Sequence, residues 1–175
     1  MSGGSVERVR AALAAAGHAD TVQVFPEGTR SAADAAAAVG CEVAQIAKSI
    51  VFRGAARSAD GMAGSRESVG HAHDRVVLVI ASGANRVDTA KVAAATGLNI
   101  KRADGGWVRD VTGFAIGGVA PLGHLTRPVV LVDEDLFRYE RVWAAAGSPM
   151  HVFATTAEEL LRLSGGARAA VKEVA

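Results

Sequence analysis

The stretch Arg75-Val-Val-Leu-Val-Ile-Ala81 decides how this sequence should fold. Every residue after Arg75 is apolar, so both alternating faces of an extended strand would be apolar. Strands of this kind are buried on both sides, in the centre of a sheet that is covered on both faces. We therefore expect a central strand here, and a second one at residues 129–132, which are equally apolar.

Helix caps and short apolar runs predict the other elements. The expected helices cover residues 6–16, 32–39, 89–96, 107–111 and 157–163, and the further strands cover 22–25, 48–52, 142–146 and 151–154. Strands follow one another closely after Val129, so the strict alternation of strand and helix fails there. The sequence predicts one mixed α+β domain over residues 1–175 with about six strands, in which residues 54–74, rich in Gly, Ala, Ser and Arg, form an inserted flexible loop.

Composition excludes several classes of protein. Half of the 175 residues are hydrophobic, which is too many for a disordered chain, and the net charge of +1 does not suit a polycation that coats nucleic acid. The single cysteine, Cys41, allows no intramolecular disulfide. The longest apolar run, residues 76–81, is far shorter than the roughly 20 residues of a membrane span, and the N-terminus lacks the apolar segment of a signal peptide. We expect a soluble cytoplasmic protein that binds no membrane.

Common catalytic motifs are missing from this sequence. It contains no dinucleotide-binding G-x-G-x-x-G, no phosphate-binding P-loop and no G-x-S-x-G nucleophile elbow. His71 and His73 fall in the expected loop without further ligands nearby, so we expect no metal site there. Asp133 and Asp135 are explained by the acidic first turn of a helix. The sequence therefore predicts no metal and no cofactor.

Lys48 is a charged residue in a largely apolar predicted strand. Only four of the 19 basic residues are lysines, and Lys48 lies in an apolar strand, where it shares one face with Ile50 and Phe52 while Ser49 lies on the other. A lone ammonium is unfavourable among apolar side chains, so Lys48 should reach a cleft or an anionic partner. The alternative is a lysine whose stem covers apolar surface while its ammonium reaches water. Because Lys48 and Ser49 point opposite ways, they cannot form a Ser-Lys catalytic dyad.

Two glycine-containing turns are candidate binding loops. In Gly117-Gly-Val-Ala-Pro121 the glycines let backbone approach a ligand closely, and the proline fixes the exit of the loop. Backbone N–H groups there could bind a carbonyl oxygen or a phosphate, although an ordinary tight turn explains the same pattern. In Gly147-Ser-Pro149, the hydroxyl of Ser148 could face a cleft or simply close a turn.

Three segments occur in an order and spacing found in a known family. They are Gln45-Ile-Ala-Lys-Ser-Ile-Val-Phe52, Arg86-Val-Asp-Thr-Ala-Lys91 and Thr112-Gly-Phe-Ala-Ile-Gly-Gly-Val-Ala-Pro-Leu-Gly-His124. They resemble the lysine strand, the helix after the central strand and the G-x-x-x-P loop of the YbaK family. This family comprises free-standing aminoacyl-tRNA deacylases and the editing domain of bacterial prolyl-tRNA synthetase. The resemblance covers roughly residues 20–165.

The resemblance implies a mixed α/β fold around a curved or barrel-like sheet with an open cleft. Lys48 would be the essential lysine, contacting the terminal adenosine of the tRNA or its phosphate, and the backbone of residues 117–121 would hold the aminoacyl carbonyl or the adenosine hydroxyls. Asp88 and Lys91 match the family helix, although a capped surface helix explains them equally well. The expected catalytic residues are Lys48, Gly117 and Gly118, and the expected substrate-binding residues are Phe25, Ser49, Val119, Ala120, Pro121 and Ser148.

The resemblance also implies an activity and its partners. We expect a free-standing trans-editing deacylase that hydrolyses the ester bond of a mischarged tRNA, such as Cys-tRNA(Pro) or Ala-tRNA(Pro). It would contact the tRNA acceptor end as a monomer or homodimer, and an aminoacyl-tRNA synthetase could assist it. Two alternatives stay open: a non-catalytic module that binds aminoacyl-adenosine or the acceptor end, and a hydrolase of small-molecule esters.

Overall fold

A mixed β-sheet forms the centre of the protein. The structure, a computed structural model, describes residues 3–29, 31–56 and 74–174. In these residues the sheet has eight strands in the order β1-β7-β6-β2-β3-β5-β8, and β4 pairs with β2 outside this path. The strands are β1 Val22–Val24, β2 Ile46–Ala56, β3 Arg75–Ser82, β4 Leu98–Arg102, β5 Val129–Asp133, β6 Val142–Ala145, β7 His151–Thr155 and β8 Ala167–Ala169.

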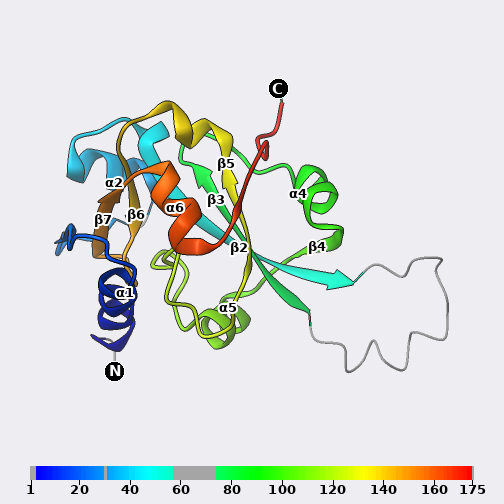
Figure 1. The fold of residues 1–175 in the computed structure, drawn as a ribbon, viewed down its shortest axis with the longest axis horizontal. Helices are drawn as coiled ribbons and strands as arrows, with labels where there is room; N and C mark the ends of the chain where they lie inside the picture. Colours follow the sequence, from blue (N-terminus) through cyan, green and yellow to red (C-terminus); the bar gives the residue numbers. More distant parts are fainter. Residues whose placement is uncertain (1–2, 30, 57–73, 175) are drawn as a thin grey trace, which may run out of the picture.

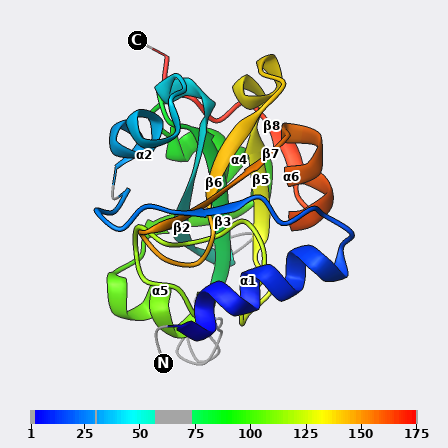
Figure 2. The same ribbon diagram turned by 90° about the vertical axis from the view of Figure 1, so that its left-hand side faces the viewer.

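Helices cover both faces of this sheet (Figures 1 and 2). The described residues contain five α-helices and two short 3₁₀ helices. They are α1 Gly3–Ala15, α2 Ala32–Val39, η1 Val43–Gln45, α4 Thr89–Thr96, α5 Gly105–Thr112, η3 Glu134–Arg138 and α6 Ala157–Ser164. The mixed α/β architecture agrees with the sequence-based expectation.

The central strand β3 contributes to two separate cores. Leu78 and Ile80 on one face pack with side chains of α1, α5 and α6, while Val77 and Val79 on the other face pack with Val92 of α4. All four β3 side chains are fully buried. The prediction of a central strand buried on both sides is therefore confirmed, with β3 lying between β2 and β5 in the sheet.

The expected number of strands was wrong. The prediction missed β4 and β8, and β2 continues to Ala56 where it was expected to end at Phe52. Gly54, expected to begin a loop, lies inside β2, where a Cβ would come within 2.8 Å of side-chain atoms of Leu98 and Val77. The close packing of three strands thus selects a glycine that looks like a loop residue in isolation. Residues 57–73 of the expected loop 54–74, with both of its histidines, lie outside the described residues.

Candidate functional site

The neighbours of β2 leave a gap in the middle of the strand. On one edge β2 pairs with β3 over residues 47–54. On its other edge it pairs with β6 only at Ile46 and Ala47, and with β4 only from Phe52 onward. No strand of the described chain pairs with residues 48–51 on this second edge, which we call the open edge of β2.

The backbone direction shows which residues face the open edge. The N–H of Gly83, which follows β3, donates to the carbonyl oxygen of Ile46 at 2.7 Å, so the carbonyl of Ile46 faces β3. Backbone groups alternate between the two edges along an antiparallel strand. The N–H and C=O groups of Ser49 and Val51 therefore face the open edge, where a ligand can pair with them.

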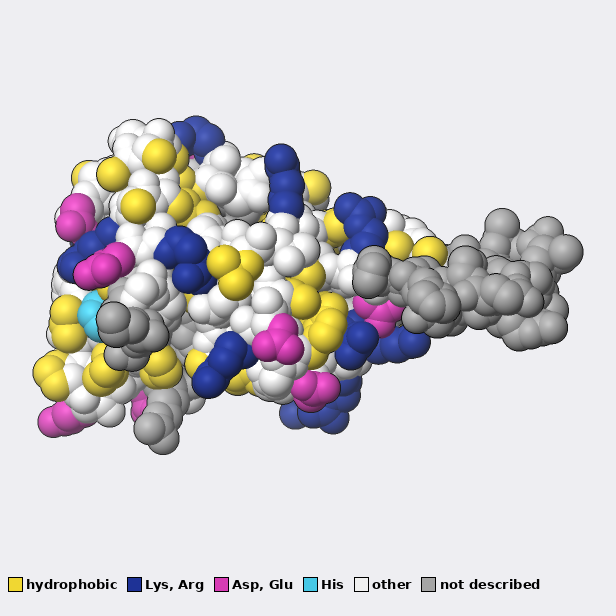
Figure 3. Space-filling model, turned by 90° about the horizontal axis from the view of Figure 1, so that it is seen from below, with side chains coloured by type: hydrophobic (Ala, Val, Ile, Leu, Met, Phe, Trp, Pro, Cys, Tyr) yellow, Lys and Arg dark blue, Asp and Glu magenta, His cyan; other side chains and the backbone are white. Residues whose placement is uncertain are grey.

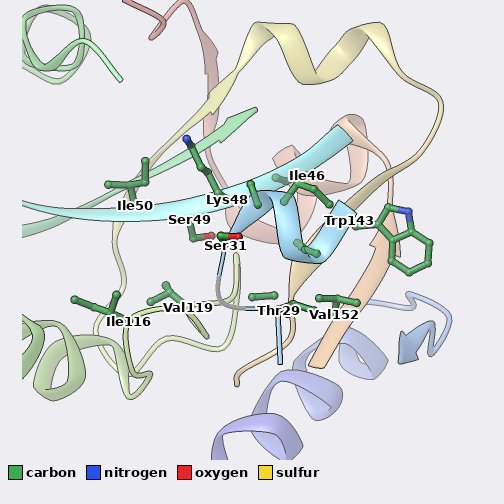
Figure 4. A pocket seen from close by; sticks show the side chains of 16 residues that line it. Thr29, Ser31, Ile46, Lys48, Ser49, Ile50, Ile116, Val119, Trp143 and Val152 are labelled. Carbon is green, nitrogen blue, oxygen red and sulfur yellow. The ribbon is translucent and has the colours of Figure 1, made fainter. Parts of the chain in front are cut away.

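Two adjoining cavities lie along the open edge. The larger has a volume of about 320 Å³ and the smaller about 240 Å³. Both are lined by Ser49 and Ile50 of β2 and by Ile116, Gly117 and Val119 of residues 113–123, which we call the glycine loop. The larger cavity also has apolar walls from α2, β6 and β7, among them Ala35, Trp143 and Val152, and further polar walls from Thr29 and Ser31. The glycine loop and the open edge thus face the same space (Figure 4).

The hydroxyl of Ser49 has no partner in this cavity. Its oxygen is buried and forms no hydrogen bond. The two other hydroxyls of the lining are already engaged, because Ser31 accepts the N–H of Asp34 at 3.0 Å and Thr29 donates to the carbonyl of Pro149 at 2.8 Å. Buried polar groups are nearly always satisfied. An orphaned hydroxyl at the wall of a cavity is therefore typical of a site that binds a polar ligand.

Lys48 lies on the opposite side of β2 from the glycine loop. In Figure 4 its ammonium points away from Ile116 and Val119, while the side chain of Ser49 points toward them. The alternation expected from the sequence is thus observed, and Lys48 and Ser49 form no dyad. Lys48 nevertheless lines the larger cavity together with Ser49, so a ligand that crosses the open edge can contact Lys48 on one face of β2 and Ser49 on the other.

The surroundings of Lys48 favour an anion. Within the described ranges its ammonium makes no ion pair and no hydrogen bond. Burial lowers the pKa of Lys48 below its ordinary value, and the nearby Arg86 guanidinium lowers it further, while Asp133 acts in the opposite direction. Asp133 is fully buried and already accepts three hydrogen bonds, from the backbone of Ser82 and Asp135 and from the amide of Asn85. An anion that binds here would relieve the repulsion between two neighbouring cations.

The two glycines of the loop have different roles. Gly117 has a positive φ of 95° and lines both cavities. Gly118 packs against the next turn, where a Cβ would lie 2.6 Å from the Cα of Ser148. Its N–H already donates to the carbonyl of Ala115 at 2.9 Å. Gly117 is therefore available to a ligand, whereas Gly118 allows the two loops to approach each other.

The hydroxyl of Ser148 is engaged outside both cavities. It lies 2.6 Å from Nδ1 of His151 and accepts the N–H of Met150 at 3.0 Å. Burial lowers the pKa of His151, and the charge of Arg10 adds to this effect. Neutral His151 can thus accept the hydroxyl proton, and the two bonds close the turn between β6 and β7.

The remaining predicted residues divide between the cavity walls and the core. Val119 lines both cavities, whereas Ala120 and Pro121 are buried and line neither. Phe25 packs beside the core of α2 and β6 and also lies outside the cavities. Among the lining residues, Ile116 could have been found from the sequence, because it directly precedes the glycine pair. Its side chain is 64% exposed. The lining residues of the larger cavity that sequence reasoning missed include Thr29, Ser31, Ile46, Ile50, Ile116, Trp143 and Val152.

A wider and more open hollow of about 810 Å³ lies elsewhere on the described surface, lined by His18, Glu42 and Glu159 among others, and it contains no buried polar side-chain atom without a partner. Figure 3 shows basic and acidic side chains interspersed with apolar ones on the face that it presents. Among the described residues, no group of three or more His, Cys, Asp or Glu side chains is placed to hold a metal ion. None of the described helices is both long and apolar enough to cross a membrane.

Known proteins are similar to this chain over most of its length. A protein of Bacillus subtilis (strain 168), "Uncharacterized protein YwhH", is 29% identical over 160 residues, which are 91% of each chain. A solved structure described as a "putative trans-editing enzyme for prolyl tRNA synthetase" is 40% identical, with a TM-score of 0.80 over 97% of this chain and 98% of that one. A chain from work on epitope backbone grafting onto scaffold proteins is 38% identical, with the same TM-score and coverage.

A family model agrees with these similarities and with the site. The model of the aminoacyl-tRNA editing domain matches residues 26–163, which include the open edge of β2, the glycine loop and the turn at Ser148. The match confirms the resemblance to the YbaK family that the lysine strand and the glycine loop suggested. This chain belongs to the aminoacyl-tRNA editing domain family.

Proposed function

We propose that this protein hydrolyses the ester bond of a mischarged aminoacyl-tRNA in trans. The observation that carries the proposal is the open edge of β2, with the orphaned Ser49 hydroxyl on one side and the unpaired Lys48 ammonium on the other. An aminoacylated tRNA end has the matching parts: an uncharged ester with ribose oxygens, and phosphates a few bonds away.

The cavity side suits the aminoacyl ester. The N–H groups of Ser49, Val51 and Gly117 are candidates to hold the carbonyl oxygen and the charge that develops on it when water attacks. Such an ester is already activated, so a positioned water and a polarised carbonyl suffice without a Ser-His-Asp triad or a metal. Among the described lining residues, Lys48 of the larger cavity points away from the glycine loop and Arg102 of the smaller cavity is exposed, so the walls around Ser49 present no buried charge. The proposed substrates therefore carry a small uncharged amino acid, such as alanine or cysteine on tRNA(Pro).

The other side suits a phosphate. The ammonium of Lys48 and the guanidinium of Arg86 are close enough for Arg86 to lower the pKa of Lys48, and within the described residues neither has an anionic partner. A phosphate near the terminal adenosine would neutralise both. Contact with so few phosphates gives weak binding, which agrees with a net charge of only +1. A synthetase partner could therefore contribute to binding of the tRNA.

A deacylation panel tests this proposal. Purified protein is mixed with Ala-tRNA(Pro), Cys-tRNA(Pro), the correct Pro-tRNA(Pro) and a tRNA that carries a charged amino acid, beside Lys48→Ala and the surface control Lys101→Ala. We expect hydrolysis of at least one small mischarged species above the spontaneous rate, loss of it in Lys48→Ala and full activity in Lys101→Ala.

Each other result contradicts a definite part of the proposal. Binding of the acceptor end without turnover would identify a non-catalytic module, and turnover of small esters with no tRNA dependence would identify a different hydrolase. Full activity of Lys48→Ala would refute the role of Lys48.

A further inference from the structure

The N-terminal helix α1 contacts both loops beside the cavities, although the family match begins only after it, at residue 26. Figure 2 shows α1 crossing in front of the sheet. Its apolar side chains Val6, Val9 and Leu13 are buried, with at most 6% exposure, and Val9 and Leu13 pack in the core that contains Leu78 and Ile80 of β3. Its polar side chains have a different set of partners.

Arg8 binds the backbone at both ends of the glycine loop. Its Nε donates to the carbonyl of Gly123 at 2.6 Å, and its Nη2 donates to the carbonyl of Gly113 at 3.0 Å. The guanidinium also lies over the ring of Phe114, 4.7 Å from its centroid. Arg8 forms no ion pair within the described residues. Its planar fork therefore joins residues 113 and 123 and fixes the segment that carries Gly117 between them.

The partly buried side chain of His124 bonds to the same segment. Its Nε2 lies 2.6 Å from the carbonyl oxygen of Ala120, so this nitrogen carries the proton and donates. Its ring packs edge-on against the ring of Phe114, with 5.1 Å between the two ring centroids. Burial lowers the pKa of His124 and the nearby Arg8 lowers it further, while the bond to Ala120 acts the other way. The neutral ring thus connects the middle of the loop to the aromatic side chain that Arg8 covers.

Ser5 fixes the second loop. Its hydroxyl donates to the carbonyl of Gly147 at 2.8 Å, and Gly147 lies so close to the helix that a Cβ would be 2.7 Å from the Ser5 carbonyl oxygen. The next residue, Ser148, packs directly on Gly118 of the glycine loop. One helix therefore sets the position of two loops that touch each other beside the cavities.

We propose that α1 is a positioning element of the catalytic site and that Arg8 is its principal positioning residue, acting on Gly117 through the ends of the loop. The proposal rests on the proposed deacylase function for its kinetic consequence. The apolar side chains of α1 already attach the helix, so the bonds of Arg8 to loop carbonyls are not needed for attachment. They are placed to hold the Gly117 backbone where the substrate carbonyl would lie, and a displacement of about 1 Å at such a position costs on the order of 100-fold in rate.

The test compares Arg8→Ala, Arg8→Lys and Arg10→Ala. Arg10 is the matched control because it lies on the same helix, pairs with the exposed Asp20 at 3.7 Å and bonds to no loop carbonyl within the described residues, and its effect on His151 is electrostatic only. We expect Arg8→Ala to lower kcat about 10- to 100-fold with KM little changed. Arg8→Lys should be intermediate, because an ammonium cannot reproduce the fork. Added ethylguanidinium should restore part of the kcat of Arg8→Ala, and ethylammonium should not.

Amide hydrogen exchange keeps the test independent of the proposed activity. In Arg8→Ala, the amides of residues 113–123 should exchange faster while those of β3 remain protected, which shows that the fold is intact. If the wild-type protein deacylates nothing, the proposed function fails and the exchange data still decide the positioning role. Unchanged exchange in residues 113–123, unchanged kcat, or loss of activity without guanidinium rescue would each overturn it.

Discussion

Lys48 and Ser49 are consecutive residues whose side chains lie on opposite faces of β2, at the stretch where that strand has no described neighbour on its second edge. A ligand that crosses the edge meets a cation on one face and an unpaired hydroxyl on the other. The two residues should therefore contribute different kinds of binding, and experiments can separate them.

Salt dependence should identify the phosphate contact. Lys48→Ala should weaken binding of an acceptor-end oligonucleotide and reduce the slope of log K against log salt concentration by about 0.7 for each phosphate that the variant no longer neutralises. Ser49→Ala should leave this slope unchanged, because in the proposed binding mode its uncharged hydroxyl faces the aminoacyl ester and neutralises no phosphate. Fluorescence anisotropy over a salt series measures both slopes, and equal slopes in Lys48→Ala and wild type would place the phosphate elsewhere.

Ser49→Ala should not destabilise the ligand-free protein. The substitution removes a buried hydroxyl that has no partner, and leaving such a group unsatisfied costs about 1–3 kcal/mol. We expect an unchanged or higher melting temperature together with weaker ligand binding. The control is Ser31→Ala, which removes the N-cap bond to Asp34 and should cost about 1 kcal/mol. A large loss of stability in Ser49→Ala would show that its hydroxyl has a structural partner.

Gly118→Ala should disrupt the site, and Gly105→Ala should not. A Cβ at Gly118 would meet three backbone atoms of Ser148 within 2.9 Å, so the two loops must separate. At Gly105, in the first turn of α5, the nearest atom is a side-chain carbon of Ile116 at 3.6 Å, an ordinary contact. We expect at least a tenfold loss of kcat/KM in Gly118→Ala, where a displacement of about 1 Å is enough, and near wild-type values in Gly105→Ala. Steady-state deacylation and a crystal structure of Gly118→Ala check this.

The alkaline pH dependence should report the charge of Lys48. Its folded-state pKa lies below the ordinary value, first because of burial and then because of Arg86. The charged form is therefore lost at a lower pH than for an exposed lysine, and acceptor-end binding should weaken as pH rises through this lowered pKa. In Lys48→Arg the decline should disappear, since arginine stays charged. Binding titrations of a non-hydrolysable analogue avoid the spontaneous hydrolysis of esters in base.

The loss of folding stability at acidic pH should report the protonation of His124. Its pKa is lowered in the folded protein, mainly by burial, so the unfolded chain binds more protons between the folded and unfolded pKa values. Stability is then lost as pH falls from the ordinary histidine pKa toward the lowered one. Urea unfolding at several pH values should show that His124→Gln loses less stability than the wild-type protein as the pH falls. An unchanged pH dependence in that variant would assign the effect to His151, whose pKa is lowered too.

Local signals predicted the elements with strong caps. α2 and α4 begin and end where the sequence predicts them, because Ser31 and Asp88 accept N–H groups of the first turn, and Gly40 and Gly97 adopt left-handed conformations at the other end. The alternation of Lys48 and Ser49 was predictable for a similar reason, since it depends only on the period of a strand.

Non-local pairing was not predictable in this way. β4 is a short and largely exposed edge strand, and it becomes a strand only because β2 passes beside it. The open edge depends on where β6 leaves β2 and where β4 joins it, and no local pattern encodes either point. The bond between Ser148 and His151 and the contacts of Arg8 belong to the same class, because they need the folded chain to bring the partners together.

The open edge of β2 also bears on solubility. Unpaired strand edges invite pairing with strands of other molecules, which leads to aggregation. Here only Ser49 and Val51 present free backbone groups along the described part of this edge, with paired strands before and after them and the glycine loop beside them. An invading strand would find no continuous edge on which to extend, whereas a small ligand needs only these two residues. Because the gap is short, the protein keeps an open edge that a ligand can pair with and offers no template for self-association there.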